Sequence, residues 1–203
     1  MSRSHFLIVL AGVAAAATGT PAAGQIGQSN GYKFLEAVKD ADGAKVKELL
    51  SAPGTTIIDT KEFSSGETAL HLVAKRGDAV YTRFLLQQGA NPNLRDKRGN
   101  TPLMVAVTAG ATDLVAIFIA AKANVDLAND SGETPLIRAV QLRSLPMVRE
   151  LLAAGADADR ADSLAGRSAR VYAEQDTRTP ALAKLFEPVP KRDRRAAVAG
   201  PKL

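Results

Sequence analysis

GETALHLVAKRGD occupies residues 66–78 and returns, with changes, as GNTPLMVAVTAGA at residues 99–111 and as GETPLIRAVQLRS at residues 132–144. The step between these phrases is 33 residues. A fixed period of this length indicates a stack of similar helical units rather than one core wrapped by loops. Such a stack offers a long open surface more readily than an enclosed cleft, so binding is a stronger hypothesis than catalysis.

Each period divides into two helical segments and a loop. In the first unit, Thr68 precedes an apolar helical segment that Gly77 ends, and Asp78 is placed to cap a second helix. Gly89 can take the left-handed backbone that follows a helix. Residues 90–98 lack helical periodicity and are expected to project as a loop or hairpin. We expect the second helix to bury four apolar side chains, namely Val80, Phe84, Leu85 and Leu86.

The recurring phrase resembles the ankyrin signature, in which a glycine and any residue precede Thr-Pro-Leu-His, any residue and Ala. Residues 66–74 meet this pattern almost fully, with Ala74 one position late, and residues 99–103 and 132–136 repeat its first half. The chain is similar to ankyrin-repeat proteins in three registers. This resemblance implies an all-α solenoid of stacked helix-turn-helix units with projecting hairpin loops.

The expected ankyrin-repeat domain covers residues 31–187. Its outermost units must turn a polar face to water, so the partial matches at both ends are expected to be capping units. The step from Gly132 to Gly166 is 34 residues, which places one inserted residue in the loop near Leu164. The resulting division is an N-terminal capping unit, three repeats and a C-terminal capping unit, at residues 31–65, 66–98, 99–131, 132–165 and 166–187.

Several positions depart from the repeat pattern. The resemblance assigns His71 to hydrogen bonds that tie its repeat to the neighbouring loop, whereas Met104 and Ile137 occupy this position in the next repeats. Those two junctions are therefore expected to depend more on apolar packing. Lys122 stands where the flanking repeats carry glycine, and a left-handed backbone there costs about 1 kcal/mol. Arg143 likewise replaces a glycine found between the paired helical segments of the earlier repeats.

The first residues of the chain have the three zones of a secretory signal. Arg3 gives a positive start, an apolar run covers residues 6–17, and small residues precede Gln25. A run of that length reaches about 18 Å as a helix, less than the roughly 30 Å hydrocarbon core of a bilayer. With no cysteine, the chain has neither disulfides nor a lipid-attachment cysteine. We therefore expect a signal peptide at residues 1–24 and an exported bacterial protein, in the periplasm or fully secreted.

The formal charge of +5 is unevenly distributed. Residues 24–183 hold 19 Lys and Arg against 19 Asp and Glu, so the repeat region is balanced. The excess lies near the ends, above all in residues 188–203, which are rich in basic residues, proline and small residues and are expected to form a flexible basic tail. The basic pI of the whole chain is therefore no indication of a nucleic-acid partner.

No constellation of residues supports catalysis or a cofactor. His71 is the one histidine beyond the signal segment, and its place in the repeat phrase gives it a structural role. Phosphate-binding glycine motifs are absent, so we expect no enzyme activity and no cofactor. The acidic residues Asp157, Asp159 and Asp162 superficially resemble a calcium loop, but the turn glycine and the distant glutamate are missing. We expect solvated loop carboxylates there and no metal site.

Recognition of a partner protein is the function that the family resemblance implies, through the hairpin tips and the exposed side of the first helices. The candidate residues at the tips are Ser64, Ser65, Glu67, Lys97, Arg98, Asn100, Asp130, Ser131 and Glu133. Those on the first helices are Lys75, Arg76, Thr108, Ala109, Gln141 and Leu142. Their chemistry changes from basic near Lys75 to Arg98 toward acidic and polar near Asp130 to Glu133.

The expected protein is thus a monomeric, non-catalytic interaction module. An alternative stays open in which it acts as a membrane-surface adaptor, because the basic tail can contact anionic lipid. Membrane contact is expected only through that tail, and no nucleic-acid partner is expected.

Overall fold

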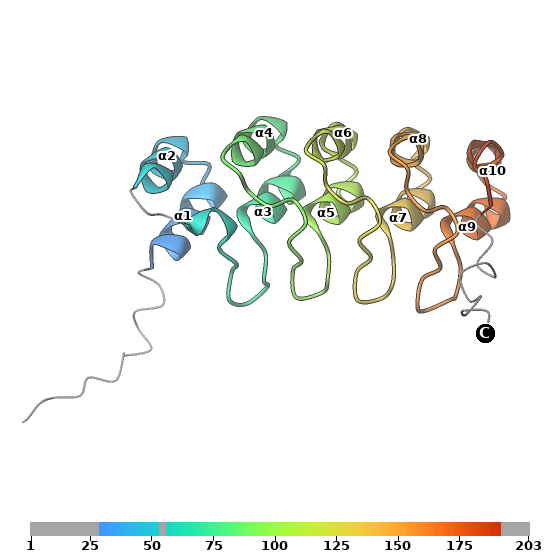
Figure 1. Ribbon diagram of the computed structural model, residues 1–203, viewed down its shortest axis with the longest axis horizontal. Coiled ribbons are helices and arrows are strands. Elements are labelled where there is room, and N and C mark those ends of the chain that lie inside the picture. The colour runs from blue at the N-terminus through green and yellow to red at the C-terminus, as the bar shows by residue number, and fades with distance from the viewer. Residues whose placement is uncertain (1–28, 53–55, 192–203) are drawn as a thin grey trace, which may run out of the picture.

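The computed structural model describes residues 29–52 and 56–191 as a row of helix pairs (Figure 1). The signal peptide expected at residues 1–24 lies outside the described residues, as does most of the basic tail. The elements are α1 (Asn30–Lys39), α2 (Gly43–Ser51), the short 3-10 helix η2 (Ile57–Asp59), α3 (Ala69–Arg76), α4 (Ala79–Gln87), α5 (Pro102–Thr108), α6 (Thr112–Ala120), α7 (Pro135–Gln141), α8 (Leu145–Ala153), α9 (Ala169–Gln175) and α10 (Ala181–Phe186).

The helices form two layers. The first helices of the pairs, α1, α3, α5, α7 and α9, lie in one row, and the second helices lie in a parallel row (Figure 1). Each helix packs against its partner and against the equivalent helix of the next pair. The loops between pairs extend past the row of first helices, on the side opposite the second helices (Figure 1). Repetition of one packing arrangement therefore builds an open, elongated molecule.

Each first helix begins at a hydroxyl residue. The Thr101 side chain accepts a hydrogen bond from the backbone N–H of Met104, and the Thr134 side chain accepts one from Ile137. The following residue is Pro102 or Pro135, which fits because the first helical position has no intrahelical use for an N–H. The Thr-Pro pair in the repeat phrase thus fixes where these helices start.

The segments after the helices adopt left-handed backbone even where glycine is missing. Gly89 and Gly155 have φ of 88° and 85° after their helices, and Lys122 has φ of 62° at the corresponding place. Arg143 has φ of 55°, in place of the glycines of the earlier repeats. The left-handed conformation expected of Lys122 is therefore confirmed. Both side chains keep the turn at a cost of about 1 kcal/mol each.

The core repeats with the period of the sequence. Leu70, Leu103 and Leu136 are each no more than 1% exposed, in three successive first helices. Burial of one such leucine contributes roughly 1.5–3 kcal/mol, and each side chain is shielded partly by the next unit of the row. A unit of this kind therefore cannot complete its core alone.

The expected inward face of α4 was partly wrong. Val80 is 76% exposed, whereas Thr82 is fully buried and its hydroxyl donates to the Asp78 carbonyl oxygen. The cause is the cap: the Asp78 side chain accepts the backbone N–H of Tyr81 and so fixes the rotational phase of the helix. In that phase the second residue of the helix faces water. The period also shows this, because the positions 33 and 66 residues later are Asp113 and Pro146.

The last pair closes the stack with a buried arginine. Arg170 is 6% exposed and pairs with Asp159, with Nε to Oδ1 at 2.7 Å. Its other nitrogens donate to the backbone carbonyl oxygens of Phe186, Val189 and Pro190. One side chain thus ties the previous loop, α9 and the segment after α10 together. The C-terminal unit is therefore sealed by a polar network as well as by apolar packing.

Candidate partner-binding groove

Each projecting loop turns on one short polar side chain. Oδ1 of Asp96 accepts the backbone N–H groups of Arg98 and Asn100, both at 2.8 Å. Asn129 accepts in the same way from two backbone N–H groups of the next loop, and Asp162 accepts from three in the loop after that. The side chain holds a tight turn in each loop, so the residues at the tip are presented from a rigid support.

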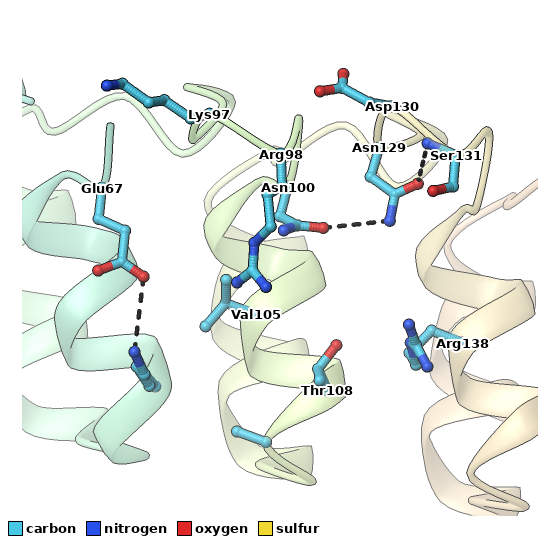
Figure 2. Close-up of a pocket in the computed structure, with 12 residues that line it drawn as sticks. Glu67, Lys97, Arg98, Asn100, Val105, Thr108, Asn129, Asp130, Ser131 and Arg138 are labelled. Atoms are coloured by element: carbon cyan, nitrogen blue, oxygen red, sulfur yellow. Dashed lines mark hydrogen bonds and ion pairs between the residues drawn. The ribbon is translucent and has the colours of Figure 1, made fainter. Parts of the chain in front are cut away.

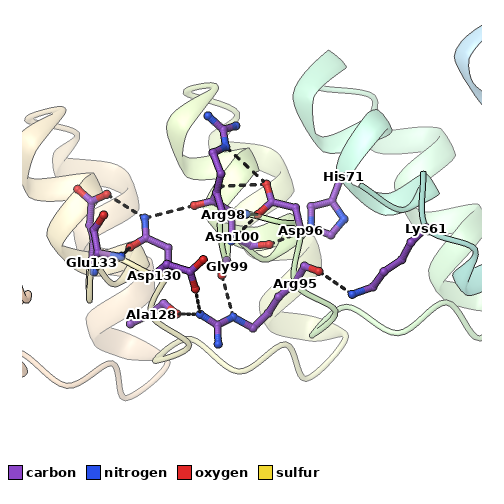
Figure 3. Close-up of polar contacts among 12 residues, drawn as sticks. Lys61, His71, Arg95, Asp96, Arg98, Gly99, Asn100, Ala128, Asp130 and Glu133 are labelled. Carbon is purple, nitrogen blue, oxygen red and sulfur yellow. Dashed lines mark hydrogen bonds and ion pairs between the residues drawn. The ribbon is translucent and has the colours of Figure 1, made fainter. Parts of the chain in front are cut away.

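Neighbouring loops are linked by backbone hydrogen bonds. The N–H of Lys97 donates to the carbonyl oxygen of Ser65, and that of Asp130 donates to Arg98. The N–H of Ser163 continues the series by donating to Ser131. Figure 3 shows a second link, in which the Arg95 guanidinium donates to the carbonyl of Ala128 and to the carboxylate of Asp130. The tips of successive loops are therefore held in register along the stack.

His71 joins the first repeat to the following loop. Its Nδ1 accepts the backbone N–H of Thr68 at 3.1 Å, and its Nε2 lies 3.0 Å from the carbonyl oxygen of Asn100. Because Nδ1 must accept, Nε2 carries the proton and donates. The ring is fully buried, and burial lowers the pKa of His71 against the opposing effect of the Asn100 carbonyl. The role that the family resemblance implies for His71 therefore agrees with these contacts.

A groove of about 660 Å³ runs between the loops and the first helices. Figure 2 shows that its border consists of loop side chains on one side and helix side chains on the other, from three successive repeats. The expected candidates that line it are Glu67, Lys75, Lys97, Arg98, Asn100, Thr108, Ala109, Asp130 and Ser131. The fold thus gathers side chains that lie up to two repeats apart in the sequence.

The lining is both charged and apolar. Arg98 projects strongly, with an 81% exposed side chain, and the Lys75 side chain is 70% exposed. Val105 and Ala109 add apolar surface on the helix side. Glu67 lies 3.8 Å from the Lys75 amine, and Asp130 lies 3.1 Å from Arg95. A groove of this composition suits a peptide segment with polar and apolar side chains.

The remaining candidates lie elsewhere. Ser64 borders a separate cavity near the N-terminal unit, and Ser65 binds the Glu62 carboxylate. Arg76 donates to the Val38 carbonyl oxygen of the previous unit. Two further exposed candidates do not line the groove, Gln141 and Leu142.

Glu133 requires a correction. It was expected at an exposed tip, but it is only 7% exposed, and its carboxylate pairs with Arg138 at 2.7 Å. Because Glu133 directly precedes the N-cap Thr134, its side chain lies back against α7 instead of projecting. The acidic end of the expected charge gradient is thus reduced to Asp130.

Three residues of the groove were missed by the sequence analysis. Val105 and Arg138 lie on the first helices, and Asn129 holds the turn of the loop. The period gave a usable signal for Asn129, because it occupies the same phase as Asp96 and Asp162. Val105 and Arg138 also share one phase, so alignment of the repeats by structure, not by signature alone, reveals both.

The acidic loop residues also differ from expectation. Asp162 is 8% exposed and accepts the Tyr172 hydroxyl at 2.7 Å, and Asp159 pairs with Arg170. Burial alone would raise the pKa of Asp162, but the Tyr172 hydroxyl and three backbone N–H donors hold it below its ordinary value. These two carboxylates are therefore structural and not solvated. Across the described residues, no three His, Cys, Asp or Glu side chains form a group that could hold a metal ion.

A model of the family "Ankyrin repeats (3 copies)" matches residues 34–126 and, in a second register, residues 82–162. The chain belongs to the ankyrin-repeat family. The fold is therefore an all-α ankyrin solenoid, as the sequence predicts. Ankyrin repeats generally mediate contacts between proteins, and an ankyrin-repeat domain is typically non-catalytic.

Curated ankyrin relatives match only over a few repeats. Nuclear factor NF-kappa-B p110 subunit of Drosophila melanogaster is 38% identical over 63 residues, which is 31% of this chain and 6% of that protein. Neurogenic locus notch homolog protein 4 of Homo sapiens is 44% identical over 55 residues, 27% of this chain and 3% of the relative. E3 ubiquitin-protein ligase KEG of Arabidopsis thaliana is 34% identical over 87 residues, 42% and 5% respectively. The chain spans less than a tenth of each relative, so the similarity concerns the repeats alone.

The described helices include none that is both long and apolar enough to cross a membrane. This finding concerns residues 29–52 and 56–191 only.

Proposed function

We propose that this ankyrin-repeat protein is a non-catalytic interaction module that binds a partner protein in the groove between its loops and first helices. The observation that carries the proposal is the groove itself, which side chains from three successive repeats border. Backbone hydrogen bonds between the loops keep its rim in register, so little order must be gained when a partner binds.

The chemistry of the groove supports recognition over turnover. Its polar groups are guanidinium, amine, carboxamide and carboxylate side chains that are largely engaged with each other, and apolar surface from α5 lies between them. None of the lining residues forms a nucleophile and general-base pair, because the only described histidine is buried behind Thr68. The arrangement therefore favours binding energy spread over a surface.

Site-specific photo-cross-linking tests the groove directly. A benzoylphenylalanine at Ala109, an exposed position that lines the groove, is expected to cross-link a discrete partner protein in cells. The control is the same residue at Gln87, exposed on the second-helix layer, where no such product is expected. Mass spectrometry identifies the cross-linked protein. A product from Gln87 and none from Ala109 would move the binding surface to the second helices.

We also propose that the protein is exported, in the periplasm or secreted. The support is the charged start, apolar run and small residues of residues 1–24 together with the lack of cysteine. N-terminal mass spectrometry of the protein from the exported fraction is expected to find a chain that begins at Gln25. Recovery of a chain that still carries Met1 to Gly24, in the cytoplasmic fraction alone, would refute export.

The membrane-adaptor alternative is tested by removing residues 192–203 and measuring sedimentation with phosphatidylglycerol vesicles. The deletion starts after residue 191 because the Val189 and Pro190 carbonyl oxygens accept hydrogen bonds from Arg170. An interaction module keeps its cross-linked partner in this variant. Loss of both vesicle binding and localisation would favour the adaptor instead.

A further inference from the structure

The groove carries an excess of positive charge. Its lining includes the basic residues Lys75, Lys97, Arg98 and Arg138, but only two acidic ones, Glu67 and Asp130. Both acidic groups are already engaged, Glu67 with Lys75 and Asp130 with Arg95, which lies outside the lining. The carboxylate of Glu133, which would have balanced the charge, is buried against Arg138. The groove therefore presents cationic side chains to anything that enters it.

Two neighbouring cations at the loop tip dominate this surface. Lys97 has no carboxylate within 4.0 Å among the described residues, and Arg98 reaches its own loop carboxylate, that of Asp96, only at that limit. The Asp96 side chain is 3% exposed and satisfies backbone N–H groups of the turn. The charges of Lys97 and Arg98 are thus available to an incoming anionic group.

An apolar cavity adjoins the groove on the N-terminal side. It has a volume of about 270 Å³, and its lining includes Tyr32, Leu35 and Phe63. Phe63 is 84% exposed and Tyr32 is 44% exposed, unusual values for large aromatic side chains. The Lys97 amine lies 5.2 Å above the centre of the Phe63 ring. Lys97 therefore connects the cavity to the groove, and the two form one continuous surface.

Building on the proposed function, we propose that this combined surface binds an extended acidic segment of the partner. One aromatic or aliphatic side chain of the segment enters the cavity beside Phe63. Asp and Glu side chains that neighbour it along the segment meet Lys97, Arg98 and Lys75. The apolar anchor supplies binding energy, and the charges supply attraction over distance and register.

The protein's own basic tail does not fit this surface, because residues 188–203 have more Lys and Arg than Asp and Glu. A flat anionic membrane fits poorly too, since Val105 and Thr108 lie on the helix side of the groove, set back from the loop tips (Figure 2). Nucleic acid is disfavoured by the 64% exposed carboxylate of Asp130 on the rim, which repels a continuous phosphate backbone. A protein segment with spaced carboxylates avoids this repulsion.

The probe is a short fluorescein-labelled peptide with one phenylalanine followed by alternating Glu and Gly. Fluorescence anisotropy with the mature chain is expected to give binding at least about tenfold tighter than for the same peptide with Gln in place of Glu, at low ionic strength. The difference is expected to shrink at about 0.15 M salt, because exposed charges are screened. Equal binding of the Glu and Gln peptides would overturn the proposal.

Two sets of variants locate the contact. Reversal of both cations, Lys97→Glu with Arg98→Glu, is expected to weaken the Glu peptide about tenfold or more. The matched control makes the same change in charge on the second helices, Arg83→Glu with Arg149→Glu, where both residues are exposed, and is expected to leave binding unchanged. Equal effects from the two pairs would show attraction to net charge alone and would contradict the site.

The aromatic cavity has its own test. Phe63→Ser is expected to weaken the peptide that contains phenylalanine while leaving a peptide with Gly at that place unaffected. Tighter binding of single-stranded DNA or of phosphatidylglycerol vesicles than of the Glu peptide would overturn the choice of a protein segment. If the Glu peptide fails but the cross-link from Ala109 persists, the acidic partner is refuted and the groove remains the binding surface. If that cross-link fails as well, the proposed function is refuted with it.

Discussion

His71 is the residue whose protonation is most directly coupled to folding. Burial lowers its pKa from the ordinary value of 6.5, so the folded state favours the neutral ring. Between the two pKa values the unfolded chain binds more protons, and stability is lost as pH falls below about 6.5. Carboxylates with lowered pKa, such as Glu62 beside Lys39 and Ser65, contribute their own loss only below about 4.5.

His71→Met separates these contributions, because Met104 already occupies the same position of the next repeat and is buried there. At pH 7.5 we expect the variant to be less stable by about 1–2 kcal/mol, since it loses the hydrogen bonds to Thr68 and Asn100. The difference from the unsubstituted protein should narrow as pH falls from 7 to 5. Urea unfolding at several pH values measures it. A constant difference across that range would show that His71 does not titrate in the folded state.

Left-handed backbone offers a second test at the scale of one residue. Lys122→Gly is expected to raise the free energy of unfolding by up to about 1 kcal/mol, because φ of 62° strains a residue with a Cβ. The matched change is Gly155→Ala, at φ of 85°, where an added Cβ meets nothing within 4 Å. It is expected to lose about 1 kcal/mol from the backbone alone. Denaturant unfolding followed by circular dichroism compares the two, and a loss with Lys122→Gly would refute the strain.

At the scale of an element, the last helix pair depends on Arg170. Arg170→Met keeps much of the side-chain bulk but removes the donors to Phe186, Val189 and Pro190 and the pair with Asp159. We expect a loss of about 3 kcal/mol, as for other buried charge networks that lose one partner. Amide hydrogen exchange should speed up in α9 and α10 and much less in α5.

The control for this element is Arg167→Met, a neighbouring exposed arginine that lies over the Tyr172 ring. Its effect on stability is expected to stay within about 0.5 kcal/mol. Equal losses from the two arginines would mean that the C-terminal unit is held by apolar packing alone.

For the whole molecule, the decisive property is that each unit is completed by its neighbours. A mature chain that ends at residue 165 lacks α9 and α10, which pack on α7 and α8. We expect its melting temperature to fall by more than about 5 °C relative to a chain that ends at residue 191, with self-association through the uncovered apolar surface. Thermal melting and size-exclusion chromatography measure both effects. Equal melting and a monomeric profile for the two chains would contradict a stack that requires its C-terminal cap.

The sequence determined those features that depend on residues close together along the chain. Thr101 and Thr134 start their helices by bonds that span three residues, and Asp78 caps α4 in the same way. The 33-residue period then places equivalent side chains in equivalent environments, which is enough to identify the family and the solenoid. Even Val80, whose burial was predicted wrongly, could be corrected by comparison with Asp113 and Pro146.

Only the tertiary structure decided which charges face a partner. Asp96, Glu133 and Arg76 are all charged residues near the loops, yet backbone turns, Arg138 and the Val38 carbonyl oxygen engage them. The bond from Arg76 to Val38 spans 38 residues and exists only because one unit stacks on the next. The signature fixes the scaffold because its hydrogen bonds are local. The positive groove follows from contacts between units, since these decide which carboxylates are buried and which cations remain exposed.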